Sequence, residues 1–181
     1  SKVLPESISI YEDPLKLKTL GSRAFDQDGV LKKKQFVVEE GIVSSYLMGQ
    51  YSANQMGLES TANAGGVSNC CVKSNFDGGI TELTTSIDKG LIVTDLMGHG
   101  VNATTGDYSR GASGFWVENG EIVAPIENMR FDDSFYNFFG ENLEAVSNKV
   151  DFNPKVGTYE SRSLGGTHCP GVLLSSFSLT L

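Results

Sequence analysis

The sequence predicts a mainly β protein, a predominantly antiparallel β-sheet sandwich or barrel-like domain with two or three short helices. Short runs rich in β-branched and aromatic residues recur along the chain, and several alternate apolar and polar positions. Turn residues separate these runs, and 21 of the 181 residues are glycine. One Asn-Gly pair lies between two such runs, which is a strong hairpin signal. The length fits one domain or little more, with a core of its own.

The first third of the chain carries three predicted strands and one helical turn. Residues 7–11 alternate apolar and polar positions and predict a strand. The runs 35–38 and 42–47 predict a hairpin, whose short loop places a glycine in the left-handed conformation. We expect Ser52 to cap a single helical turn over residues 53–56, which a following glycine ends.

The middle of the chain is rich in small residues. Residues 60–77 predict a loop or a loosely paired strand. Residues 81–90 predict a short helix with Thr81 as its cap, and 91–94 predict a buried strand. The glycine-rich stretch 98–114 predicts a long loop, and loops of that length in compact domains are often functional.

The last third contains the clearest hairpin. Asn119–Gly120 joins the β-rich runs 114–118 and 121–125, and this pair favours a type I′ turn because both residues tolerate a positive φ. The spacing of apolar residues over 132–148 predicts an amphipathic helix. Residues 171–181 alternate again and predict a final strand.

Composition excludes several classes of protein. The net charge of −8 makes nucleic-acid binding a poor fit, because phosphate contacts need clustered cations. The basic run Lys32–Lys34 is expected to be a solvated strand face. No apolar stretch is long enough to span a membrane as a helix. The odd number of cysteines, Cys70, Cys71 and Cys169, fits a reducing compartment.

Two chemical interpretations of the glycine-rich stretch are weak. A phosphate-binding G-x-G-x-x-G would need glycine where Ala103 stands, and the Gly-Lys-Ser/Thr of a P-loop is absent. His99, Asp107 and Ser109 are the residue types of a hydrolase triad. However, Ser109 lacks the G-x-S-x-G setting, and all three residues come from one short segment.

Two further interpretations stay open. The stretch is either a bend whose Asn102, Asp107 and Ser109 bond to nearby backbone, or an exposed edge that holds a peptide or a partner chain. Trp116 belongs either to the core or interface or to such a site. On the second interpretation, the substrate- or partner-binding residues are Gly98, His99, Gly100, Asn102, Asp107, Ser109, Arg110 and Trp116.

The sequence does not contain a complete metal site of a known pattern. It has no C-x-x-C pair and no H-E-x-x-H, and its only histidines are His99 and His168. Cys169 is either a small buried apolar side chain or one metal thiolate whose other ligands come from outside this chain.

The segments Leu96–Asn102 and Thr105–Ile122 resemble the PmbA (TldE) branch of the TldD/PmbA family. Other matching pieces follow in order along nearly the whole chain, among them Val3–Glu6, Glu12–Pro14 and Ala64–Gly66. The resemblance implies that residues 1–181 are one β-rich C-terminal domain of a longer protein. The N-terminal α/β half of that protein would lie outside this chain, which begins without methionine.

The resemblance also implies a function. The family consists of cytoplasmic metallopeptidases, also labelled modulators of DNA gyrase, in which a TldD-type subunit carries a zinc-binding His-Glu-x-x-x-His helix. The PmbA type generally lacks that helix and pairs with the TldD type, and the heterodimer degrades unfolded peptides and trims leader peptides.

We therefore expect this chain to supply a substrate chamber and a partner interface, to a TldD-type subunit or a second copy. Zinc would belong to the family complex and not to this chain alone, so the isolated domain should be inactive. The alternative from another class is a non-catalytic β-sheet assembly module.

Overall fold

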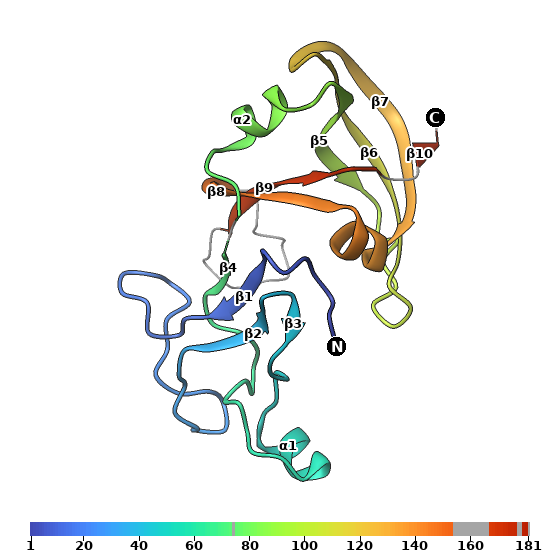
Figure 1. Cartoon of the computed structure of the whole chain (residues 1–181). Helices are drawn as coiled ribbons and strands as arrows, with labels where there is room; N and C mark the ends of the chain where they lie inside the picture. The colour runs from blue at the N-terminus through green and yellow to red at the C-terminus, as the bar shows by residue number, and fades with distance from the viewer. Residues whose placement is uncertain (74, 154–166, 177–178, 181) are drawn as a thin grey trace. The chain divides into compact units, whose positions relative to one another are not determined.

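The computed structural model describes residues 1–73, 75–153, 167–176 and 179–180, and antiparallel strands dominate it (Figure 1). The mainly β class is therefore confirmed. The described strands are β1 (Ser9–Glu12), β2 (Gln35–Glu39), β3 (Ile42–Val43), β4 (Cys70–Lys73), β5 (Lys89–Met97), β6 (Asp107–Glu118), β7 (Glu121–Ser134), β8 (Leu143–Asn153), β9 (Thr167–Leu174) and β10 (Leu179–Thr180). The described helices are α1 (Gln50–Met56), α2 (Ile80–Thr85) and the π-helix η1 (Asn137–Glu141).

The chain divides into two compact units, one built mainly from residues 6–73 and the other mainly from residues 75–151. In the first unit, the sheet has the order β3-β2-β1-β4. The predicted hairpin between β2 and β3 is confirmed, and its two loop residues Glu40 and Gly41 have φ values of 48° and 77°. Residues 60–77, predicted as a loop or a loosely paired strand, contain the short strand β4, which pairs with β1.

Helix α1 begins earlier than predicted. Its N-cap is Gly49, and the carboxylate of Asp28 accepts the Gln50 amide over 2.8 Å. Ser52 therefore lies inside the helix, and the prediction that it caps the helix is wrong because a carboxylate from a distant segment satisfies the first turn. Gly57 ends the helix with a φ of 66°, as predicted.

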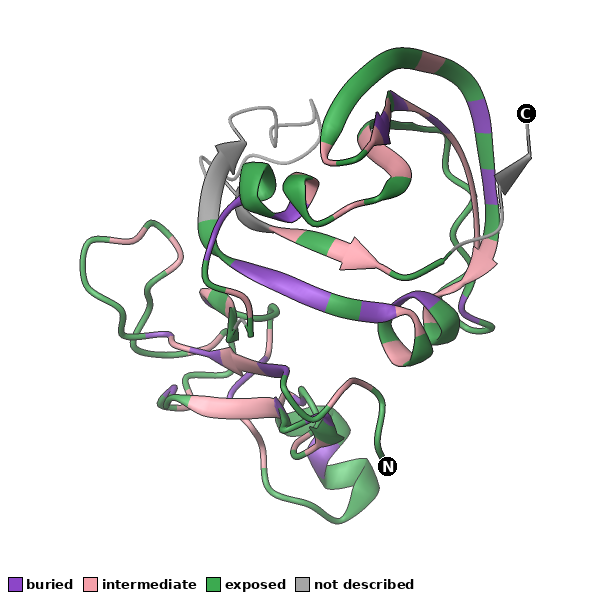
Figure 2. Cartoon of the chain, turned by 45° about the horizontal axis from the view of Figure 1, so that its top comes forward, coloured by how far each residue is buried: buried purple, intermediate pink, exposed green. Residues whose placement is uncertain are grey.

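In the second unit, the described sheet has the order β10-β7-β6-β5. Asn119 and Gly120 have φ values of 52° and 78°, so the predicted type I′ hairpin between β6 and β7 is confirmed. One face of the sheet packs on a core. In the part of β7 that contributes to this core, buried and exposed residues alternate along the strand (Figure 2). The buried members of this core are Ala112, Met129, Phe131 and Phe138.

The predicted glycine-rich loop is about half strand. The loop itself covers residues 98–106, and β6 begins at Asp107. Gly114 lies inside β6, where a Cβ would come within 1.8 Å of the Ile92 carbonyl oxygen on β5. This glycine therefore allows a close backbone approach at an irregular point of the ladder and does not form a turn.

The predicted helix over 132–148 is wrong. Strand β7 extends to Ser134, the short helix η1 follows, and β8 begins at Leu143. Near η1 the apolar spacing that suggested a helix comes from aromatic residues that share a packing partner. The rings of Phe135 and Phe138 pack on Tyr108, with ring centroids 5.2 and 5.4 Å away. The apolar residues that follow belong to β8, which forms a two-stranded sheet with β9.

Three smaller differences concern α2, β5 and the chain end. Helix α2 is present, but its N-cap is Gly79 and not Thr81, because the Glu82 carboxylate accepts the Gly79 amide over 2.7 Å. The predicted buried strand forms as β5 but is only partly buried. The single strand predicted over 171–181 corresponds to two described strands, β9, which begins earlier and ends at Leu174, and β10 at Leu179–Thr180.

Candidate functional site

The loop between β5 and β6 turns back along the start of β6 (Figure 1). The Ser109 amide donates to the Gly100 carbonyl over 2.6 Å, and the Asn102 amide donates to the Asp107 carbonyl over 2.9 Å. These bonds fix the loop to the strand that follows it. Four of the predicted binding residues lie in the loop, namely Gly98, His99, Gly100 and Asn102.

Gly100 is the position at which the loop touches β6. A Cβ on this residue would lie 1.6 Å from the Ser109 carbonyl oxygen, which no side chain can tolerate. Gly98 is different, because its φ of 91° favours glycine while the space around it is open. Gly100 therefore allows the loop to pack against the protein's own strand β6.

Asn102 and Asp107 organise the loop. The Asn102 Oδ1 atom accepts the amides of Thr104 and Thr105 over 3.0 and 3.3 Å. The Thr105 hydroxyl donates to the Asp107 carboxylate over 2.6 Å. These are the local bonds of a structured bend, so both side chains shape the loop.

Ser109 belongs to a three-residue cluster across β6 and β7. Its hydroxyl donates to Asp132 over 2.6 Å, and Arg130 Nη2 donates to the Ser109 oxygen over 2.9 Å. Arg130 also forms an ion pair with Asp132 at 3.0 Å. Within the described part of the chain, no hydrogen bond joins His99 to Asp107 or Ser109, and the exposed His99 does not form a triad with them. Arg130 and Asp132 could not be found from the sequence, because only the β6–β7 register brings them to Ser109.

Arg110 reaches the loop from the other face of β6. Its Nη2 atom donates to the carbonyl of Gly98, the first residue after β5. Its Nε atom is buried without a hydrogen-bond partner among the described residues. Arg110 therefore connects the beginning of the loop to the strand at its end.

Trp116 lies further along β6 and outside this loop region. It pairs in register with Leu91 and Ala124, is half-buried, and donates from Nε1 to Glu118 over 3.0 Å. The structure therefore brings Ser109 and Arg110 to the loop but does not bring Trp116 there. A binding role for Trp116 stays a prediction.

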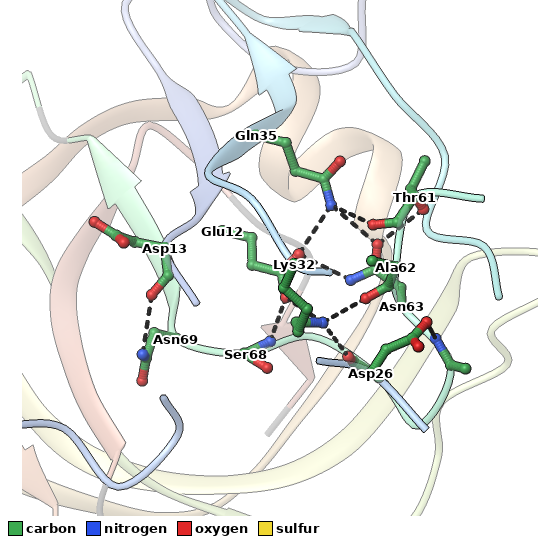
Figure 3. Close-up of polar contacts among 12 residues, drawn as sticks. Glu12, Asp13, Asp26, Lys32, Gln35, Thr61, Ala62, Asn63, Ser68 and Asn69 are labelled. Atoms are coloured by element: carbon green, nitrogen blue, oxygen red, sulfur yellow. Dashed lines mark hydrogen bonds and ion pairs between the residues drawn. The ribbon is translucent and has the colours of Figure 1, made fainter. Parts of the chain in front are cut away.

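A second polar cluster, the Glu12–Lys32 centre, is buried in the unit of residues 6–73 (Figure 3). Lys32 Nζ lies 3.0 Å from Glu12 Oε1, and each side chain is 1% exposed. Lys32 also donates to the Ala62 carbonyl over 2.6 Å. The predicted solvated face is therefore wrong for Lys32, although Lys33 and Lys34 are exposed. The reason is a carboxylate twenty residues earlier, which sequence periodicity cannot reveal.

Three further donors surround the Glu12 carboxylate. Gln35 and Asn63 donate from their side-chain amides over 2.9 and 2.8 Å, and Ser68 donates from its backbone over 2.6 Å. Burial raises the pKa of Glu12, but these hydrogen bonds and Lys32 outweigh it, so the pKa lies below its ordinary value. The centre thereby holds residues 60–68 against β1 and acts as a structural support.

The described side chains do not form a metal site. Among them, no three or more His, Cys, Asp or Glu side chains come together in a way that could hold a metal ion. Cys169 lies in β9, but its side chain is outside the described part of the chain. Its predicted role as a metal thiolate therefore stays a prediction. No helix among the described residues is long and apolar enough to cross a membrane.

The whole chain, residues 1–181, matches the model of the PmbA/TldA metallopeptidase C-terminal domain. The chain belongs to this family. It is 44% identical over 157 residues to a metalloprotease PmbA homolog of Haemophilus influenzae. The aligned residues cover 87% of this chain and 35% of that protein. The chain spans about a third of the length of the curated relatives it matches.

Two solved structures share the fold. A Thermotoga maritima protein described as a candidate modulator of a DNA gyrase superposes with a TM-score of 0.83 at 28% identity, covering 99% of this chain and 40% of that one. TldE from Thermococcus kodakarensis superposes with a TM-score of 0.80 at 21% identity, covering 99% and 41%. The match to the family model over the whole chain confirms the family that the sequence predicted.

Proposed function

We propose that this chain is the C-terminal domain of a PmbA/TldE-like subunit of a zinc-dependent peptidase complex that acts on unfolded or leader peptides. In this proposal, its two units supply a wall of the substrate chamber and an interface for a TldD-type partner, and the isolated domain is inactive. Support comes from family membership and from the metalloprotease name of the Haemophilus relative. The odd cysteine count fits the reducing cytoplasm in which we place the complex.

We propose that the zinc ligands come from outside this chain. The sequence contains two histidines, His99 and His168, and no His-Glu-x-x-x-His. Bound zinc would supply a water of lowered pKa for peptide hydrolysis. The described residues would hold and orient the peptide, and they do not perform the chemical step.

The observation that carries the proposal is the edge of β5. This strand ends the described sheet order and pairs only with β6 among the described residues. An extended peptide can add to such an edge through backbone hydrogen bonds, which depend little on its sequence. Leu96 and Met97 are 39% and 48% exposed at the end of this strand and offer apolar contact.

The adjoining loop supports the same function. The bond between Ser109 and Gly100 holds it in place, and the space beside Gly98 is open. A fixed rim at the end of a strand that pairs on one side only among the described residues lowers the entropy cost of ordering a bound peptide. The loop and the β5 edge together form the proposed peptide-binding wall.

A scan with N-methylated peptides tests this proposal. The full-length protein that contains this chain, with its TldD-type partner, would bind and cleave an unstructured peptide and a series in which each amide in turn is methylated. Strand addition predicts that affinity falls at every second position, because alternate amides face the sheet edge. Unmethylated peptides with permuted side chains serve as the control and should retain affinity within about threefold, since backbone bonds dominate.

Two results would contradict the proposal. Equal sensitivity at all positions, or none, would show that β5 does not hold the peptide as an added strand. Peptide hydrolysis by residues 1–181 alone with added zinc would show that the domain contains a complete active site. Assembly with the partner but without any peptide affinity would favour the β-sheet assembly module instead.

A further inference from the structure

A short segment in the first unit presents apolar side chains to solvent. We name residues 14–23 the leucine loop, because Leu15, Leu17 and Leu20 within it are 55%, 86% and 81% exposed. Single exposed leucines are common on protein surfaces, but three highly exposed leucines within six residues indicate an interaction site. The loop projects from the strands in Figure 1 and is mostly exposed in Figure 2.

The leucine loop is held in one conformation by its own hydrogen bonds. The Arg23 amide donates to the Pro14 carbonyl over 3.0 Å and closes the loop. The Asn69 side-chain amide donates to the Asp13 carbonyl over 3.0 Å and to the Ser22 hydroxyl over 2.9 Å. A loop that is already ordered loses less conformational entropy when it docks, so its leucines are presented for binding.

The charge of the leucine loop is opposite to that of the chain. The exposed cations Lys16 and Lys18 lie between its leucines and the exposed Arg23 ends the loop, whereas the chain carries a net charge of −8. The neighbouring carboxylate of Asp13 lies 3.7 Å from Lys34 and is partly neutralised by it. A complementary surface would therefore combine an apolar hollow with carboxylates around it.

We propose that the leucine loop docks into an acidic, apolar-lined hollow on the TldD-type partner subunit. This inference rests on the proposed function, which supplies that partner. A protein surface is favoured over an anionic membrane. Such a membrane would attract the three cations of the loop but would repel the rest of the chain, whose net charge is −8. The partner surface is also favoured over the same loop of a second copy, because two basic loops would repel each other.

Two measurements on the full-length protein and its TldD-type partner test the inference, calorimetry for the affinity and stopped-flow mixing for the association rate. The Leu17→Ser/Leu20→Ser variant should bind the partner at least about tenfold more weakly, as expected for apolar anchors at an interface. The Lys16→Glu/Lys18→Glu variant should lower the association rate and reduce its dependence on salt. The matched control is Ile122→Ser/Val123→Ser, whose side chains are 57% and 60% exposed in the other unit, and it should leave affinity unchanged.

The possible outcomes separate this inference from the proposed function. Partner binding that survives the leucine substitutions overturns the role of the loop and leaves the proposed function intact. A Leu17→Ser/Leu20→Ser variant that unfolds at a lower temperature but binds the partner with unchanged affinity also overturns the role of the loop. In that case the leucines would pack against another part of their own polypeptide. Loss of binding to vesicles of phosphatidylcholine and phosphatidylserine, with partner binding intact, would assign the loop to membranes. Absence of partner binding in the unsubstituted protein would refute the partner interface itself, while the peptide scan still tests β5.

Discussion

Replacing Lys32 with methionine removes one charge from a buried ion pair while keeping a side chain of comparable length. Lys32 and Glu12 are each 1% exposed, so water cannot replace the lost ammonium group without entering the fold. The Ala62 carbonyl also loses the donor that lies 2.6 Å away. The variant should therefore be destabilised through both groups that Lys32 now satisfies.

The structure sets the size of the effect. Removing one partner of a buried ion pair costs about 3–5 kcal/mol, because the other charge stays buried. Gln35, Asn63 and the Ser68 amide still donate to the Glu12 carboxylate, which keeps the loss within that range. A domain with a total stability of about 5–15 kcal/mol would lose a large share of it.

The pH dependence follows from the same bonds. The pKa of Glu12 is lowered in the folded protein, so its stabilising effect is present above the ordinary carboxyl pKa and is lost as the pH falls. Lys32 contributes to that lowering, and in Lys32→Met the pKa of Glu12 should rise. The variant should therefore begin to lose this stabilisation at a higher pH than the unsubstituted protein.

Urea unfolding and hydrogen exchange measure these effects together. Because the two units could unfold separately, exchange of the Ser68 amide gives a local measure of the Glu12–Lys32 centre. Lys34→Met is the control, since its ion pair with Asp13 is 3.7 Å long and Lys34 is 60% exposed, so it should cost less than about 1 kcal/mol. The reasoning is refuted if Lys32→Met behaves like Lys34→Met and the Ser68 amide exchanges at its original rate.

Three other substitutions have defined outcomes. Gly100→Ala should detach the loop from Ser109 and destabilise the protein by about 1–3 kcal/mol, seen as faster exchange of the Ser109 amide, and an unchanged exchange rate would count against the contact. Glu82 accepts the Gly79 amide, which lowers its pKa from 4.5 to about 2, so the stability deficit of Glu82→Gln should be present above pH 4.5 and shrink toward pH 2 in acid titrations. Gly120→Ala should lower stability by about 1–2 kcal/mol in urea unfolding because of its φ of 78°, and a neutral effect would contradict the type I′ turn.

Local chemistry explains which elements the sequence could predict. The turn at Asn119–Gly120 needs two residues that tolerate a positive φ, and that requirement is visible in the residues themselves. The same holds for Gly57, which ends α1 in the left-handed conformation. The loop over 98–114 was predicted too long, because the sequence does not show whether a glycine forms a turn or, like Gly114, allows a close approach to Ile92 in the sheet.

The remaining features depend on contacts between distant segments. Lys32 lies in a basic run whose sequence predicts a solvated face. Only the structure shows that Lys32 is buried in an ion pair with Glu12. Ser109 could be chosen from its motif, but its partners Arg130 and Asp132 follow from the register of β6 and β7. Sequence reasoning therefore predicted the family and the strand-rich fold, while the networks around individual side chains required coordinates.

Among the described residues β5 pairs on one side only, which matters for the behaviour of the protein when it is handled without a partner. A strand edge without a partner can pair with the same edge of another molecule, which leads to aggregation in concentrated solution. Asp95 stands near the end of this edge, where its carboxylate accepts the Leu96 amide over 3.1 Å, and charges at such positions oppose pairing between copies. This acidic side chain is thus expected to oppose precipitation of the protein through pairing of its own β5 edges.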